Sequence, residues 1–276
     1  MSWILLDEQK RLFFDTPSQL NFFDAKAAFV LAEKKIGRSD DFVAFVIDTE
    51  SGLPPKGDYC VRVRSDASGL GYTETPDSLW PSTALLSLQV HTNTPALRTA
   101  LHEIVHTWAA YIELTPNAEL PALPLRHDAH HWADFFDYGS SCMNESKLIW
   151  LPASDGSFKR EFHKSNDPAF GLCPVDLYLM GLLQRDKVGP LRFFSEALPE
   201  EVSTVVDTRP SSLLPDRMPA LGKTTKFQQT WIVVTADAPK GAELATEVAS
   251  RFSQYETNFF AACNRSATLT IARAKG

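Results

Sequence analysis

The chain has 276 residues, of which 44% are hydrophobic and 22% are charged, and these are the proportions of an ordinary globular protein. Its formal net charge of −7 gives no basic excess for binding nucleic acid or an anionic membrane, so we expect neither as a partner. No apolar run approaches the roughly 20 residues of a membrane span. Residues 1–8 lack the basic segment of a signal peptide, so we expect a cytoplasmic protein, one exported without a cleaved signal, or a trimmed chain.

Hydrophobic periodicity predicts one helix and three strands in the first third of the chain. We expect the helix over residues 18–36, with Gly37 as its C-cap, because apolar residues recur there at helical spacing. Residues 65–81, rich in Gly, Ser, Asp and Pro, are predicted to be a loop. The strands are expected over residues 42–48, 59–64 and 85–91.

A second helix is predicted around an HExxH pattern at residues 102–106. Thr94 is its expected N-cap and Pro95 its expected first residue, where the missing N–H of proline is harmless. The pair Thr115-Pro116 is expected to end it. The apolar residues recur at helical spacing, at Leu97, Leu101, Ile104, Val105 and Trp108.

The HExxH pattern itself predicts a zinc site. Positions four apart lie on one face of a helix, so His102 and His106 can direct two imidazoles at one metal ion. Glu103 can project beside that ion and accept a proton from water that the metal acidifies. The pattern resembles the zincin class of zinc metallopeptidases.

Beyond residue 115 the sequence predicts fewer regular elements. Residues 146–171 contain several turn signals, and residues 185–225 are rich in proline and predicted to be irregular. A short buried helix is expected within residues 173–182, with Asp176 near its start. A strand over 227–235, a long helix over 241–263 and a strand over 267–272 are expected to follow. The four cysteines are widely spaced and are expected to be free thiols, at Cys60, Cys142, Cys173 and Cys263.

A catalytic zinc site needs a third protein ligand and leaves its fourth position to water. The metzincin extension HExxHxxGxxH is excluded, because Ala109 stands at the glycine position and Ile112 at the third histidine position. The candidates for the third ligand are His131, His130, Glu145, Asp137 and Asp176.

Four motifs together resemble a group of mostly uncharacterised bacterial proteins predicted to be zinc metallopeptidases. They are HExxH at 102–106, His-Trp at 131–132, Gly-Ser-x-x-Met at 139–143 and Asp-Leu-Tyr-Leu-Met-Gly-Leu at 176–182. The resemblance covers residues 97–183 and implies His131 as the third ligand. In the gluzincins, a further zincin group, a later glutamate often within an Asn-Glu pair completes the site, and Asn144-Glu145 fits that alternative.

Further residues are candidates for roles beside the metal. Asp176 has two interpretations, a carboxylate that orients a ligand histidine through its other ring nitrogen or the N-cap of its helix. Tyr138, Tyr178 and His130 are candidate hydrogen-bond donors to the oxyanion formed during hydrolysis.

The resemblance to zincins implies one α+β catalytic domain over residues 1–276. It would comprise an N-terminal sub-domain of about 1–115, with a mixed sheet plus helices, and a mainly helical C-terminal sub-domain of about 116–276. The HExxH helix is expected at the floor of the cleft between them. The strand over 85–91 is expected at the cleft's edge, where it would pair with an extended substrate.

The expected function is zinc-dependent hydrolysis of peptide bonds, with a peptide or protein as substrate, zinc ligated by His102, His106 and His131, and Glu103 as the general base. Two alternatives stay open. One is a zincin-like binding protein with a structural zinc, and the other is a zinc hydrolase acting on an amide or ester outside proteins.

Overall fold

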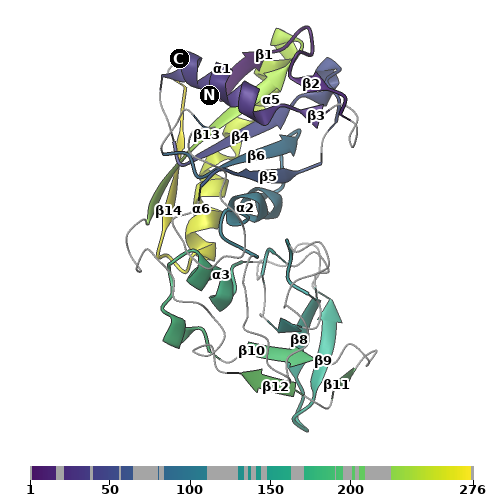
Figure 1. Ribbon diagram of the computed structural model, residues 1–276, viewed down its shortest axis with the longest axis vertical. Helices are drawn as coiled ribbons and strands as arrows, with labels where there is room; N and C mark the ends of the chain where they lie inside the picture. Colours follow the sequence, from purple (N-terminus) through teal and green to yellow (C-terminus); the bar gives the residue numbers. More distant parts are fainter. Residues whose placement is uncertain are drawn as a thin grey trace.

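A six-stranded mixed sheet lies at one end of the molecule (Figure 1). The structure, a computed structural model, describes residues 2–16, 22–37, 40–55, 57–64, 80, 84–110, 130–133, 136–137, 141–143, 148–162, 171–189, 191–194, 201–202, 205–208 and 225–274. The sheet has the order β1-β13-β4-β6-β5, and β14 also pairs with β13. All neighbours are parallel except β5, which is antiparallel to β6. The strands are β1 (Trp3–Leu6), β4 (Phe42–Ile47), β5 (Tyr59–Arg62), β6 (Ser87–Thr92), β13 (Lys226–Thr235) and β14 (Thr268–Ala272).

Helices cover both faces of this sheet. All of β4 is buried, as the unbroken apolar sequence predicts for a strand in the middle of a covered sheet. Val43 and Phe45 face one side, where they pack with Phe29 of α1 (Ala25–Ile36). Phe42 and Ala44 face the other side, which is covered by α2 (Leu97–Val105), α5 (Ala238–Ser250) and α6 (Phe252–Ala262).

The first helix begins later than the sequence predicts. Residues 17–21 lie outside the described part, but Phe22–Phe23 form β3, which pairs with β2 (Phe13–Phe14) instead of extending the helix. Asp24 then caps α1 by accepting a hydrogen bond from the Ala27 N–H at 2.8 Å. The prediction of Gly37 as C-cap is confirmed, because its φ of 69° is left-handed.

The predicted helix over 241–263 is two helices. α5 and α6 meet at Arg251, where ψ changes to −6°. Asp237 caps α5 by accepting a hydrogen bond from the Lys240 N–H at 3.1 Å. The strands predicted on either side of this pair are confirmed as β13 and β14.

The middle of the chain forms small antiparallel sheets, which lie at the other end of the molecule (Figure 1). In one, β10 lies between β12 and β7, and in the other β9 lies between β11 and β8. The prediction of a mainly helical C-terminal part is therefore wrong for the described residues. The turn signal at Ser154-Asp155-Gly156 marks the hairpin between β8 and β9. The elements are β7 (Phe136–Asp137), β8 (Leu148–Pro152), β9 (Phe158–Phe162), α3 (Pro174–Leu179), β10 (Leu191–Phe194), β11 (Glu201–Val202) and β12 (Val205–Thr208), with 3₁₀ helices η1 (Thr49–Ser51) and η3 (Arg185–Lys187).

The main sheet draws on both ends of the chain. β13 lies between β1 and β4, so strands from before and after residue 115 share one hydrogen-bonded ladder. The expected sub-domain boundary at about residue 115 therefore separates strands that belong to one sheet. The structure is a mixed α and β protein, and within the described residues no helix is both long and apolar enough to cross a membrane.

The strand before α2 is not at the edge of the sheet. β6 lies between β4 and β5, so its backbone groups are paired on both sides. The expectation that this strand edges a cleft is therefore wrong. The edge position belongs to β5, whose other side faces no strand among the described residues.

Candidate metal centre

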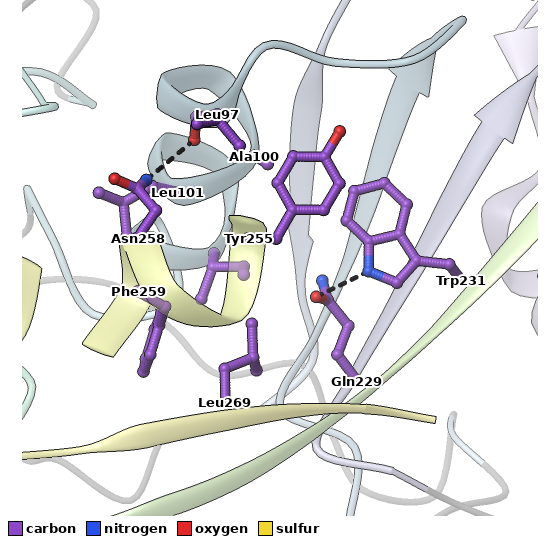
Figure 2. Close-up of a pocket in the computed structure, with 10 residues that line it drawn as sticks. Leu97, Ala100, Leu101, Gln229, Trp231, Tyr255, Asn258, Phe259 and Leu269 are labelled. Carbon is purple, nitrogen blue, oxygen red and sulfur yellow. Dashed lines mark hydrogen bonds between the residues drawn. The ribbon is translucent and has the colours of Figure 1, made fainter. Parts of the chain in front are cut away.

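The start of the HExxH helix contacts α6. α2 starts at Leu97, two residues after the predicted Pro95, and no side chain caps it. The Pro95 carbonyl accepts a hydrogen bond from the Tyr255 hydroxyl at 2.8 Å. Asn258 Nδ2 donates to the Leu97 carbonyl at 3.3 Å (Figure 2). Thr94, the predicted N-cap, instead has a buried hydroxyl with no hydrogen-bond partner in the described part of the chain.

The helix also ends early, at Val105, far ahead of the predicted stop at Thr115-Pro116. His106 still has a helical backbone, with φ of −55° and ψ of −15°. Its N–H donates to the His102 carbonyl at 3.1 Å. The four-residue spacing therefore places both imidazoles on one face, although the second lies at the last turn.

Three imidazole rings converge beside α2. His106 Nε2 lies 3.0 Å from His102 Nε2, and His131 Nε2 lies 3.3 Å from the same atom. One ligand atom from each of the three histidines lies within 4.8 Å of the others. Of the described residues, this trio is the group of histidine, cysteine and acidic side chains that can hold a metal ion.

The protonation state of His102 can be assigned from its partner. Its Nδ1 lies 2.6 Å from the Cys142 carbonyl oxygen, which can only accept, so Nδ1 holds the proton. Burial lowers the pKa of His102 to about 4, so the ring is neutral at pH 7. Burial, together with the neighbouring His102 and His131 rings, lowers the pKa of His106 well below its usual value. His102 Nε2 therefore presents a lone pair to the other two rings.

The spacing fits a tetrahedral metal. Two nitrogens bound to one tetrahedral zinc at about 2.0–2.1 Å lie about 3.3 Å apart. The two Nε2 separations of 3.0 and 3.3 Å at His102 agree with that value. Neutral imidazoles that turn unprotonated nitrogens toward one point repel each other unless a proton or a cation lies between them. The three rings can therefore hold one metal ion between them.

Glu103 lies beside the three histidines and at the edge of an open cavity. The residue is only 4% exposed, and Oε1 is 3.9 Å from His102 Nε2. A cavity of about 220 Å³ is lined by Arg98, Thr99, His102 and Glu103. Glu103 and His102 thus border the same space, which is large enough for part of a substrate.

The other candidate ligands lie elsewhere or outside the described residues. His130 is exposed and does not belong to the cluster, although it neighbours His131. The carboxylate of Asp176 accepts hydrogen bonds from Trp132 Nε1 and other groups instead of facing the histidines. Only the backbone of Asp137 is described, in β7, and Glu145 lies outside the described residues.

The candidate donors to an oxyanion stay predictions. Tyr178, in α3, is 4% exposed and packs in the larger core cluster. Tyr138 lies outside the described residues. The interpretation of Asp176 as the N-cap of its helix is wrong, because Cys173 is the N-cap. Asp176, three residues on, instead accepts a hydrogen bond from the Cys173 N–H at 2.9 Å, as the second member of a capping box.

Two features of the site were missed by the sequence reasoning. Arg98 lies one helical turn before His102 and lines the cavity, a placement that its four-residue spacing from His102 signals. The Cys142 carbonyl fixes the His102 ring, but a backbone oxygen has no signature in side-chain patterns.

The chain matches no family model, no curated protein and no solved structure.

Proposed function

We propose that this protein is a zinc-dependent peptidase with His102, His106 and His131 as metal ligands and Glu103 as general base. The observation that supports it most directly is the convergence of three Nε2 atoms beside a buried carboxylate at an open cavity. Zinc in such a site supplies Lewis acidity toward water and toward the substrate carbonyl.

The side chains of the chain have distinct tasks in this proposal. His102 lies in α2 and His106 is the C-cap residue of the same helix with a helical backbone, so the backbone there fixes their relative position. Glu103 takes a proton from the attacking water and delivers it to the leaving amine. Its burial leaves the carboxylate less screened by bulk water, which strengthens its electrostatic interactions with neighbouring groups.

A catalytic centre explains the site better than a structural zinc. A structural site is closed by four protein ligands, whereas the cluster in the described residues has three histidines. The cavity that reaches His102 and Glu103 leaves room for water and substrate. A peptide is the proposed substrate. The alternative is an amide or ester that is not part of a protein, and the experiment below distinguishes the two.

Replacing Glu103 by glutamine tests the proposal. Glu103→Gln should keep its zinc but lose hydrolysis of a peptide library by about 100-fold or more, because glutamine cannot accept the proton. Zinc content by mass spectrometry and product formation are measured on the same samples. The matched control is Glu247→Gln, which removes an exposed carboxylate on α5 and should leave the rate unchanged.

Wild-type hydrolysis by the zinc-loaded Glu103→Gln variant would exclude Glu103 as the base. Cleavage of small amides or esters, with no peptide cleaved, would indicate a zinc hydrolase whose substrate is not a peptide or protein. A zinc-loaded wild type without any hydrolysis would favour a binding protein.

A further inference from the structure

A buried carboxylate connects the segments that complete the histidine cluster. Asp176, on α3, is fully buried. Its Oδ1 accepts a hydrogen bond from Trp132 Nε1 at 2.9 Å, and its Oδ2 accepts one from Ser141 Oγ at 2.6 Å. Oδ2 also accepts the Cys173 N–H at 2.9 Å, which anchors the carboxylate to the start of its own helix.

Each of the first two donors is adjacent in sequence to a group that contacts His102. Trp132 follows His131, whose Nε2 faces His102 Nε2. Ser141 precedes Cys142, whose carbonyl accepts from His102 Nδ1. Asp176 therefore binds the residue that follows the third histidine and the residue that precedes the carbonyl acceptor of His102.

The two segments have little regular structure of their own. Residues 130–133 and 141–143 form bends, turns and one isolated bridge. They are tied to each other because the backbone N–H of Trp132 donates to the Met143 carbonyl at 3.2 Å. Within the second segment, the Met143 N–H donates to Ser141 Oγ at 3.0 Å. No helix fixes His131 as α2 fixes His102 and His106, so its position depends on these side-chain contacts.

We propose that Asp176 is a positioning residue of the metal centre, which holds His131 and the Cys142 carbonyl where three imidazoles can share one ion. This inference rests on the proposed zinc site. Charge-assisted hydrogen bonds to a buried carboxylate are short and directional, and burial excludes the water that would compete for them. The role differs from direct orientation of a ligand ring, because Asp176 acts through Trp132 and Ser141.

The test is the zinc affinity of Asp176→Asn in the full chain, measured by competition with a chelator, together with the absorption spectrum of the cobalt(II)-loaded protein. Asparagine keeps the shape, but its NH₂ group cannot accept a hydrogen bond. In one orientation it leaves Trp132 Nε1–H without an acceptor, and in the other it leaves Ser141 Oγ and the Cys173 N–H without one. We expect the Kd for zinc to rise about 10- to 100-fold, as for other outer partners of metal ligands, and the cobalt spectrum to change.

The matched control is Asp48→Asn. Asp48 is also buried, and it accepts hydrogen bonds from the Ser51 N–H at 3.2 Å and from Thr235 Oγ1 at 2.7 Å, away from the histidines. It should lose stability and keep the wild-type Kd. An equal loss of zinc affinity in both variants would assign Asp176 a general structural role and overturn the inference.

Single-donor variants cover the case in which Asp176→Asn does not fold. Trp132→Phe and Ser141→Ala each remove one donor to Asp176, and each should weaken zinc binding several-fold, whereas Ser141→Thr keeps the hydroxyl and should stay near wild type. Wild-type Kd values in Asp176→Asn, or in both single-donor variants, would overturn this inference alone. A wild-type protein that binds no zinc would overturn the proposed function as well.

Discussion

At the scale of single residues, Cys142 contributes to the site through its backbone. Its carbonyl oxygen fixes which nitrogen of His102 bears the proton, while its thiol is fully buried and free. A buried thiol loses solvation when it ionises, so burial raises the pKa of Cys142 and of Cys173 well above the usual value. Burial also raises the pKa of Cys263 to about 12. These cysteines behave as small apolar side chains and not as nucleophiles.

This chemistry predicts slow thiol labelling of the native protein. The thiolate is the reactive form, so a raised pKa lowers its fraction at pH 8 and the labelling rate should climb as pH rises. We expect these three buried thiols to react with an aromatic disulfide reagent at least about 100-fold more slowly than in the unfolded chain, whereas Cys60 is only half-buried. After unfolding without reductant, all four cysteines should react, because all are free. Fast labelling of more than one thiol in the native protein would contradict these pKa shifts, and fewer than four reactive thiols after unfolding would reveal a disulfide.

At the scale of elements, packing overrides local signals at the ends of helices. Helical periodicity correctly predicts that α2 exists and which of its faces is buried. Its start is contacted by Tyr255 and Asn258 of α6, which are far away in sequence, and lies two residues after the position that capping rules predict. Its end coincides with a 2.6 Å contact between Thr107 Oγ1 and Ser87 Oγ of β6, which attaches the chain to the sheet. The residues of α6 and β6 that contact the two ends of α2 cannot be identified from the sequence of α2 itself.

The junction of α5 with β13 gives a prediction at this scale. Alanine is normally favoured over glycine inside a helix by about 1 kcal/mol. A Cβ on Gly241, however, would overlap Thr235 Cγ2 and lie 2.9 Å from Thr235 Cβ. We therefore expect Gly241→Ala to lower the free energy of unfolding by about 1–3 kcal/mol, measured by denaturant titration.

Thr235→Ser provides the control, because it removes the methyl group and keeps the hydroxyl that donates to Asp48 at 2.7 Å. The double variant Gly241→Ala/Thr235→Ser should recover part of the loss, as a positive coupling in the mutant cycle. A Gly241→Ala protein as stable as wild type would show that the helix moves away from the sheet at no cost.

At the scale of the whole molecule, the candidate site joins some segments that sequence patterns predict well and others that they do not predict. His102, Glu103 and His106 could be predicted because one helix turn relates them. The prediction of His131 as a ligand rests on a resemblance of motifs, since no periodicity connects it to α2. The short strands β8 to β12 are not predictable in this way, because runs of two to five residues show too little alternation of apolar and polar residues to be recognised as strands. The part of the fold that holds the third histidine was thus the least predictable.

The proposed function requires that His131 complete a three-histidine zinc site with the HExxH helix. It is tested most directly by zinc content and zinc Kd of the wild type, His131→Ala and His130→Ala, all purified without added metal. His130 is the natural control, because it is the neighbouring histidine and is exposed outside the cluster. We predict one zinc per chain in the wild type and in His130→Ala, and a loss of at least about 100-fold in affinity for His131→Ala. Wild-type zinc affinity in His131→Ala would contradict the account and assign the third ligand to another residue.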